Sequence, residues 1–144
     1  MTNPTPGQMI LMEISIPTPR GFSFKRTAIS HGWYGLRPFE LDQLNWTLAR
    51  VIDLGEARPV TVKVSESPGA IKIKIGRKLG KRAAEKVARD VRHILRLDDD
   101  LMAFYEMVAK DSDFGWIASA GAGRMLRSPT VFEDLVKTIC TTNC

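Results

Sequence analysis

The sequence predicts an α+β protein in which an antiparallel sheet is followed by a group of helices. Residues 60–64 and 71–75 alternate apolar and polar side chains, with the period of two that half-buried strands show. After Gly80 the apolar residues recur at helical spacing instead, and further helical segments follow. Strands that precede helices in this way are typical of a sheet covered on one face.

The first elements are a tail, a strand and a short helix. Residues 1–8 contain two prolines and a glycine and predict a flexible tail. Residues 9–16 are apolar enough for a strand, which two prolines then end. Within residues 21–30 the apolar side chains fall at helical spacing, so we expect a short helix there.

An antiparallel meander is predicted next. Its strands are expected at residues 33–41, 46–54, 60–64 and 71–75. Pro38 makes the first of them an edge or bulged strand. Ser67-Pro68-Gly69 forms the turn of the last hairpin. The Val and Ile side chains of that hairpin share one face and should be buried, whereas Lys63, Lys72 and Lys74 share the other and should stay in water.

Helices account for the rest of the chain. Residues 84–95 predict an amphipathic helix with a basic polar face. Asp98-Asp99-Asp100 is expected to cap the next helix, over 101–108, and to supply the acids of its first turn. A short segment at 114–120 follows, and Gly121-Ala122-Gly123 ends it.

The last helix has two candidate starting points. Ser128 can cap it with Pro129 at the first helical position, or Thr130 and Glu133 can form a capping box. Its apolar stripe consists of Phe132, Leu135, Val136, Ile139 and Cys140. We expect only the helical segments 101–108 and 116–117 to hold this stripe.

That stripe still runs where the chain stops. We therefore expect the 144 residues to be a piece of a longer protein. The alternative is that Asn143 serves as a left-handed C-cap and that the protein ends at Cys144.

Composition excludes several classes of protein. The chain is 44% hydrophobic and 26% charged, which rules out a disordered or coiled-coil protein. No apolar run approaches the roughly 20 residues of a membrane span, so no membrane association is expected. No basic residue precedes the first apolar run, which argues against a secretory signal and for a cytoplasmic protein. The two cysteines, Cys140 and Cys144, are too few and too close to the end for a disulfide-stapled fold.

The net charge of +5 is concentrated in the middle of the chain. Residues 59–96 hold eleven Lys and Arg against three acidic residues, a balance of +8, whereas the remainder carries −3. A basic segment of this kind indicates a polyanionic partner such as nucleic acid. The alternative is that it forms a solvated face with no partner.

No active site emerges from these residues alone. His31 and His93 have no metal-ligand spacing to each other or to a cysteine, so His31 is interpreted as structural and His93 as solvated. Cys140 is better explained as a small buried hydrophobe than as a ligand. We expect no metal site in this chain.

Three segments carry a resemblance to a known family. Residues 123–143, GRMLRSPTVFEDLVKTICTTN, resemble the start of the catalytic region of the helix-hairpin-helix DNA glycosylases. Residues 30–39, SHGWYGLRPF, resemble the N-terminal extension of the bacterial members, and residues 21–24, GFSF, a G-x-S-F step of 8-oxoguanine glycosylases. The similarity runs over most of residues 12–143.

This resemblance implies two domains. Residues 9–97 would form an α+β domain similar to one half of the TATA-binding protein, and residues 98–144 would begin an all-α domain. The family flips a damaged base, alkylated or oxidised, out of duplex DNA and removes it without a cofactor. Its members are monomeric, and this one would act in the bacterial cytoplasm, associated with the nucleoid.

The resemblance also assigns residues. The catalytic carboxylate and the occasional lysine nucleophile of the family would lie beyond Cys144, so this chain alone is predicted to be inactive. Asp134 is expected on the exposed side of its helix and is no substitute. Asn143 matches the position that contacts the orphaned base, and Gly21 the position that reads the oxidised purine.

A second function stays open at this point. The chain could instead be a free-standing, non-enzymatic α+β module that binds nucleic acid or another partner. The coding sequence after residue 144 distinguishes the two, because only a glycosylase would continue into a helix-hairpin-helix.

Overall fold

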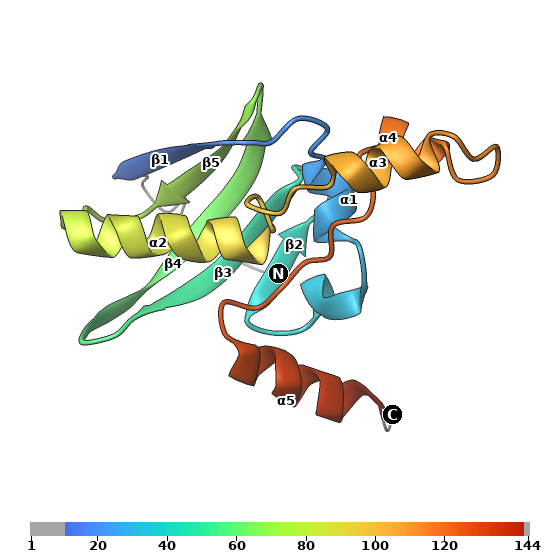
Figure 1. Ribbon diagram of the computed structural model, residues 1–144. Helices are drawn as coiled ribbons and strands as arrows, with labels where there is room; N and C mark the ends of the chain where they lie inside the picture. Colours follow the sequence, from blue (N-terminus) through green and yellow to red (C-terminus); the bar gives the residue numbers. More distant parts are fainter. Residues whose placement is uncertain (1–10, 143–144) are drawn as a thin grey trace.

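The computed structural model describes residues 11–142, in which a five-stranded antiparallel sheet supports several helices (Figure 1). The strand order is β1-β5-β4-β3-β2. The strands are β1 Met12–Pro17, β2 Phe39–Asp42, β3 Thr47–Leu54, β4 Ala57–Ser67 and β5 Ala70–Ile75. The predicted α+β class, with strands before helices, is confirmed. The tail expected at residues 1–8 lies outside the described residues.

The hairpin of β4 and β5 has the register that the sequence pattern predicts. Val62 pairs with Ile75 and Val64 with Ile73, so the apolar side chains of both strands share one face. These four side chains are buried. On the other face Lys63 pairs with Lys74, and no helix of residues 11–142 covers this face. Strand β4 is longer than predicted because its ends also pair, Ala57 with Leu54 and Ser67 with Ala70.

The helices are α1 Phe24–Ala28, α2 Lys81–Ile94, α3 Met102–Val108, α4 Trp116–Ser119 and α5 Val131–Thr142. Helix α2 covers the apolar face of the sheet and buries Val87, Val91 and Ile94 there, as its apolar stripe predicts. Helix α1 begins after Ser23, whose side chain accepts the Arg26 amide. Helices α3 and α4 form an arm that projects beyond the sheet (Figure 1).

The strand predicted at residues 33–41 is largely wrong. Residues Gly32–Gly35 form a 3-10 turn, η1, and only Phe39–Asp42 pair in the sheet. Pro38 has no N–H to donate to a ladder, so strand pairing begins after it. The amide of Trp33 is also occupied, because it donates to Nδ1 of His31.

The role predicted for the three consecutive aspartates is only partly right. The Asp100 carboxylate accepts the Met102 amide at 2.9 Å, but α3 has no acidic residue in its first turn. Asp98 pairs with Arg92 and Asp99 with Arg96. Arg92 lies in the last turn of α2 and Arg96 just beyond it, so the pair of Arg92 with Asp98 joins α2 to the following segment.

Helix α5 begins at the second of its two candidate positions. Its first turn is capped by Thr130, whose hydroxyl accepts the Glu133 amide at 3.3 Å. The capping box is half formed, because the Glu133 carboxylate is bonded to Arg50 and Lys137. Ser128 is fully buried and lies outside the helix.

Candidate nucleic-acid interface

Helix α5 is held to the rest of the molecule by a cluster of three charged side chains and one hydroxyl, here called the clamp: Arg50, Glu133, Lys137 and Ser128. Arg50 reaches from β3 and donates two hydrogen bonds to Glu133, at 3.1 and 2.5 Å. Lys137 donates to Glu133 at 2.6 Å and to the Ser128 hydroxyl at 3.1 Å. Both cations are buried, at 5% and 7% exposure, so the shared carboxylate is essential to the cluster.

Aromatic rings complete the clamp. The Arg50 guanidinium lies 4.5 Å and the Lys137 ammonium 4.6 Å from the centre of the Phe39 ring. Burial raises the pKa of Glu133, but the hydrogen bonds from Arg50 and Lys137 outweigh burial and leave this pKa below its ordinary value. Glu133 is therefore ionised in the clamp at neutral pH.

The clamp turns the polar side of α5 inward and its apolar stripe outward. Phe132 is 75% exposed, Leu135 55% and Ile139 57%. The predicted partners, 101–108 and 116–117, lie in the arm on the far side of the molecule from α5 (Figure 1). Two further expectations are wrong for the same reason. Asp134 is not on the free side but accepts the Ser128 amide at 2.8 Å, and Cys140 is exposed, not buried.

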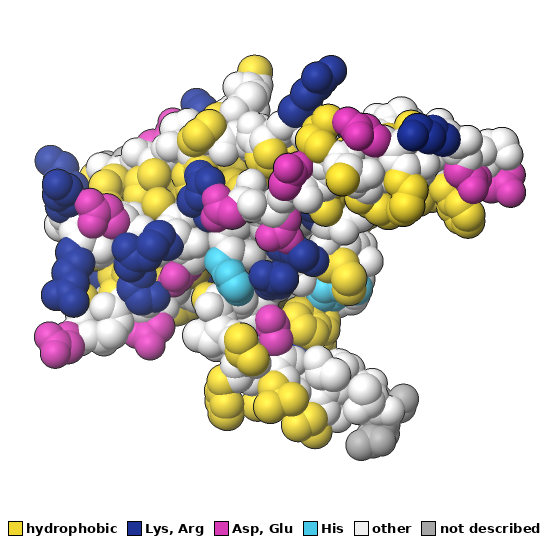
Figure 2. Space-filling model, viewed as in Figure 1, with side chains coloured by type: hydrophobic (Ala, Val, Ile, Leu, Met, Phe, Trp, Pro, Cys, Tyr) yellow, Lys and Arg dark blue, Asp and Glu magenta, His cyan; other side chains and the backbone are white. Residues whose placement is uncertain are grey.

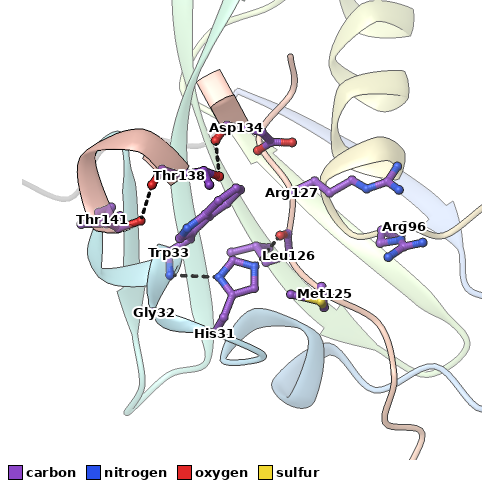
Figure 3. Close-up of a pocket in the computed structure, with 11 residues that line it drawn as sticks. His31, Gly32, Trp33, Arg96, Met125, Leu126, Arg127, Asp134, Thr138 and Thr141 are labelled. Atoms are coloured by element: carbon purple, nitrogen blue, oxygen red, sulfur yellow. Dashed lines mark hydrogen bonds between the residues drawn. The ribbon is translucent and has the colours of Figure 1, made fainter. Parts of the chain in front are cut away.

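A groove of about 600 Å³ runs between η1, the segment 125–127 and α5 (Figure 3). Trp33, Leu36 and Met125 give it an apolar surface, and Arg96 and Arg127 lie at the end away from α5. Both ring nitrogens of His31 are hydrogen-bonded within the fold, which agrees with the structural role interpreted from the sequence. Its Nδ1 accepts the Trp33 amide and its Nε2 donates to the Leu126 carbonyl at 2.8 Å.

The remaining polar groups of this groove are also engaged. The hydroxyls of Thr138 and Thr141 donate to carbonyls of their own helix, each at 2.8 Å. Asp134 is bonded to the backbone of Ser128. Within residues 11–142 the groove therefore presents apolar surface and two arginines, but no general acid and base in contact with each other.

Gly21 lies in the turn between β1 and α1, at φ +73°. Gly121 packs directly on it, since a Cβ at Gly121 would lie 2.3 Å from the Gly21 carbonyl oxygen. Tyr105 closes the other side of Gly21, with its ring 3.5 Å from the position of a Cβ. A turn glycine explains this geometry, and the base-reading role stays a prediction. Asn143 lies outside the described residues.

The clamp is the feature that sequence reasoning missed. Its signal was weak but present: Glu133 and Lys137 stand four apart, and Arg50 occupies a position of β3 whose neighbours two residues away, Leu48 and Ile52, are buried. Nothing local indicates that Arg50 and Glu133, 83 residues apart, form a pair.

The described residues show neither a metal-binding cluster nor a membrane-spanning helix. Residues 11–142 contain no group of three or more His, Cys, Asp or Glu side chains placed to hold a metal ion. They also contain no helix with the length and hydropathy needed to cross a bilayer.

Comparison with known proteins gives a likeness in structure. No family model matches the sequence, and no curated protein is significantly similar to it. In structure, the chain is similar to the 3-methyladenine DNA-glycosylase from Archaeoglobus fulgidus, with a TM-score of 0.69 over 90% of this chain. The chain has a DNA glycosylase-like fold. Sequence identity is 19%, and the chain spans 44% of the length of that glycosylase.

Proposed function

We propose that this chain is the N-terminal portion of a helix-hairpin-helix DNA glycosylase that removes an alkylated or oxidised base from duplex DNA in the bacterial cytoplasm. The observation that carries the proposal is the structural likeness to a DNA glycosylase over 90% of the chain. Residues 9–97 would be the domain similar to half of the TATA-binding protein, and residues 98–144 the start of the all-α domain. The motif at residues 123–143 supports the same assignment.

The outward stripe of α5 gives independent support. A helix with several apolar side chains more than half exposed, here Phe132, Leu135 and Ile139, is typical of an element that packs against further structure. In the proposed enzyme those further helices would cover Phe132, Leu135 and Ile139 and would supply the catalytic carboxylate. This chain would contribute Asn143 at the orphaned base and Gly21 at the damaged base.

A second candidate is a non-enzymatic module that binds nucleic acid. One observation favours it: the groove beside α5 brings no general acid and base into contact, and a second groove, at the beginning of α2, is lined by Lys and Arg side chains. Such a module would bind duplexes with and without damage equally well, because its affinity would come from the phosphate backbone.

Base release from damaged duplexes separates the candidates. The 144-residue chain and the product of its complete coding sequence are incubated with duplexes that contain 3-methyladenine or 8-oxoguanine, and abasic sites are measured. The longer product should release one of these bases, and the 144 residues alone should not. Release should fall when Asn143→Ala is introduced into the longer product. A coding sequence that ends at residue 144, with no base release, contradicts the glycosylase.

A further inference from the structure

The basic segment 59–96 does not form one face of the molecule. Lys63, Lys72 and Lys74 lie on the open face of the sheet, and Lys72 is paired with Glu13. Arg92 and Arg96 are neutralised by Asp98 and Asp99. The cations that remain together are those at the beginning of α2.

These cations line a groove of about 750 Å³ between the β3–β4 turn and the first turns of α2, here called the basic groove. Its lining residues include Lys81, Arg82, Lys86 and Arg89, with Glu56 as the single carboxylate. Figure 2 shows Lys and Arg side chains gathered at this end of the molecule. The groove therefore has an excess of positive charge at one place.

Most of this charge is available to a ligand. Lys81, Arg82 and Arg89 are exposed, and none of them forms an ion pair within residues 11–142. Lys86 differs, because Asp90 holds it at 2.6 Å. In addition, α2 has no acidic residue in its first turn, so its backbone dipole adds to the field of the side chains instead of opposing it.

The spacing of the cations fits a phosphate backbone. Residues 82, 86 and 89 recur at intervals of four and three and thus lie along one side of α2. Seven residues of helix extend over about 10 Å. The phosphates of one DNA strand repeat about every 3.4 Å along the duplex axis, so this row spans about three phosphate steps.

We propose that the basic groove binds the phosphate backbone of duplex DNA. This proposal rests on the proposed function only for the choice of duplex DNA as the partner. The groove is distinct from α5, since the two flank opposite ends of α2: Arg96, just beyond the end of α2, lines the groove beside α5.

Other polyanions fit the groove less well. A membrane-binding surface combines basic residues with exposed apolar side chains that enter the lipid. The residues that line the basic groove include no exposed large apolar side chain, because Leu54 is half-buried. An acidic protein would need apolar anchors as well for a stable interface.

The test compares two variants with the same loss of charge. Arg82→Gln/Arg89→Gln removes two cations of the groove, and Lys63→Gln/Lys74→Gln removes two from the open face of the sheet. Binding to an undamaged duplex is measured by fluorescence anisotropy over a series of salt concentrations. The slope of log K against log[salt] is negative, and the groove variant should make it less steep by about 1.8, or 0.9 for each lost phosphate contact. The sheet variant should leave the slope unchanged.

Three results would overturn the proposal. The two variants could show equal slopes, or the unchanged chain could fail to bind DNA at low salt. The groove variant could also lose binding to phosphatidylserine vesicles or to polyglutamate while it still binds DNA like the unchanged chain. Thermal unfolding checks that both variants fold. Lys81→Gln alone should make the salt dependence less steep by about 0.9. Since the duplex is undamaged, the outcome is independent of base release. DNA binding by the basic groove can therefore be confirmed while the glycosylase proposal is contradicted, and the glycosylase proposal can be confirmed while binding by the groove is contradicted.

Discussion

At the scale of single residues, the contact between Gly121 and Gly21 demands the absence of a side chain. Gly121 has φ +63°, and a Cβ there would lie 2.3 Å from the Gly21 carbonyl oxygen. Gly121→Ala should therefore lower the free energy of unfolding by about 3 kcal/mol, from the left-handed strain and the clash together. Gly55→Ala is the control, since its φ is +75° and no atom lies within 4 Å. It should cost about 1 kcal/mol in urea unfolding. Equal losses would mean that the Gly121 contact relaxes.

Glu133 is the residue on which the clamp depends. Glu133→Gln leaves Arg50 and Lys137 buried without a carboxylate, and should weaken the docking of α5 by about 3 kcal/mol. Amide hydrogen exchange along α5 measures this. Glu40→Gln is the control, because its pair with Arg37 is exposed and should change stability by less than about 1 kcal/mol. Unchanged exchange in α5 would contradict the role of the clamp.

The same carboxylate predicts a pH dependence. The pKa of Glu133 is lowered in the folded protein, so its contribution to stability is complete at neutral pH and is lost as the pH falls through the folded-state pKa. The protection factors of the α5 amides, which compare the observed exchange rate with the intrinsic rate at the same pH, should fall below about pH 4, where an unfolded glutamate is protonated. Glu133→Gln should abolish this acid dependence, and a persistent dependence would assign it to other groups.

At the scale of elements, α5 and the sheet should differ sharply in local stability. Helix α5 has 12 residues, and an isolated helix of that length is marginal in water. Its apolar stripe is uncovered, and the clamp holds one side only. Amide exchange at residues 135–139 should therefore be far faster than at Val62 or Ile73, which are buried between paired strands. Equal protection in a monomer would indicate a finished domain and favour the non-enzymatic module.

At the scale of the whole molecule, the exposed stripe of α5 should make the chain self-associate. Phe132→Gln/Ile139→Gln should reduce association in sedimentation velocity without loss of stability, since both side chains are more than half exposed. Leu44→Gln is the control. Leu44 is 94% exposed but stands apart from α5 in a β-turn, so its replacement should not change association. If the unchanged chain is monomeric, the exposed stripe of α5 does not drive self-association and this prediction is wrong.

The sequence alone predicts the parts of this protein whose signal is local. The alternation of residues 60–64 and 71–75 predicted the central hairpin, and the stripe of residues 84–95 predicted α2 and its buried face. Both patterns suffice because one face of each element packs against the other. The period of two and the period of 3.6 then state directly which side chains are buried.

Which face of α5 points inward depends on contacts that form only in the folded molecule. Helical spacing shows where apolar side chains gather, but not whether anything covers them. Arg50, brought from β3 by a pairing across 83 residues, binds Glu133 and turns the polar side of α5 toward the body. Ion pairs also divided the basic segment, because Asp98 and Asp99 neutralise one end while the basic groove keeps its charge. Periodicity describes one element at a time, whereas the orientation of α5 depends on a charge from a strand 83 residues away.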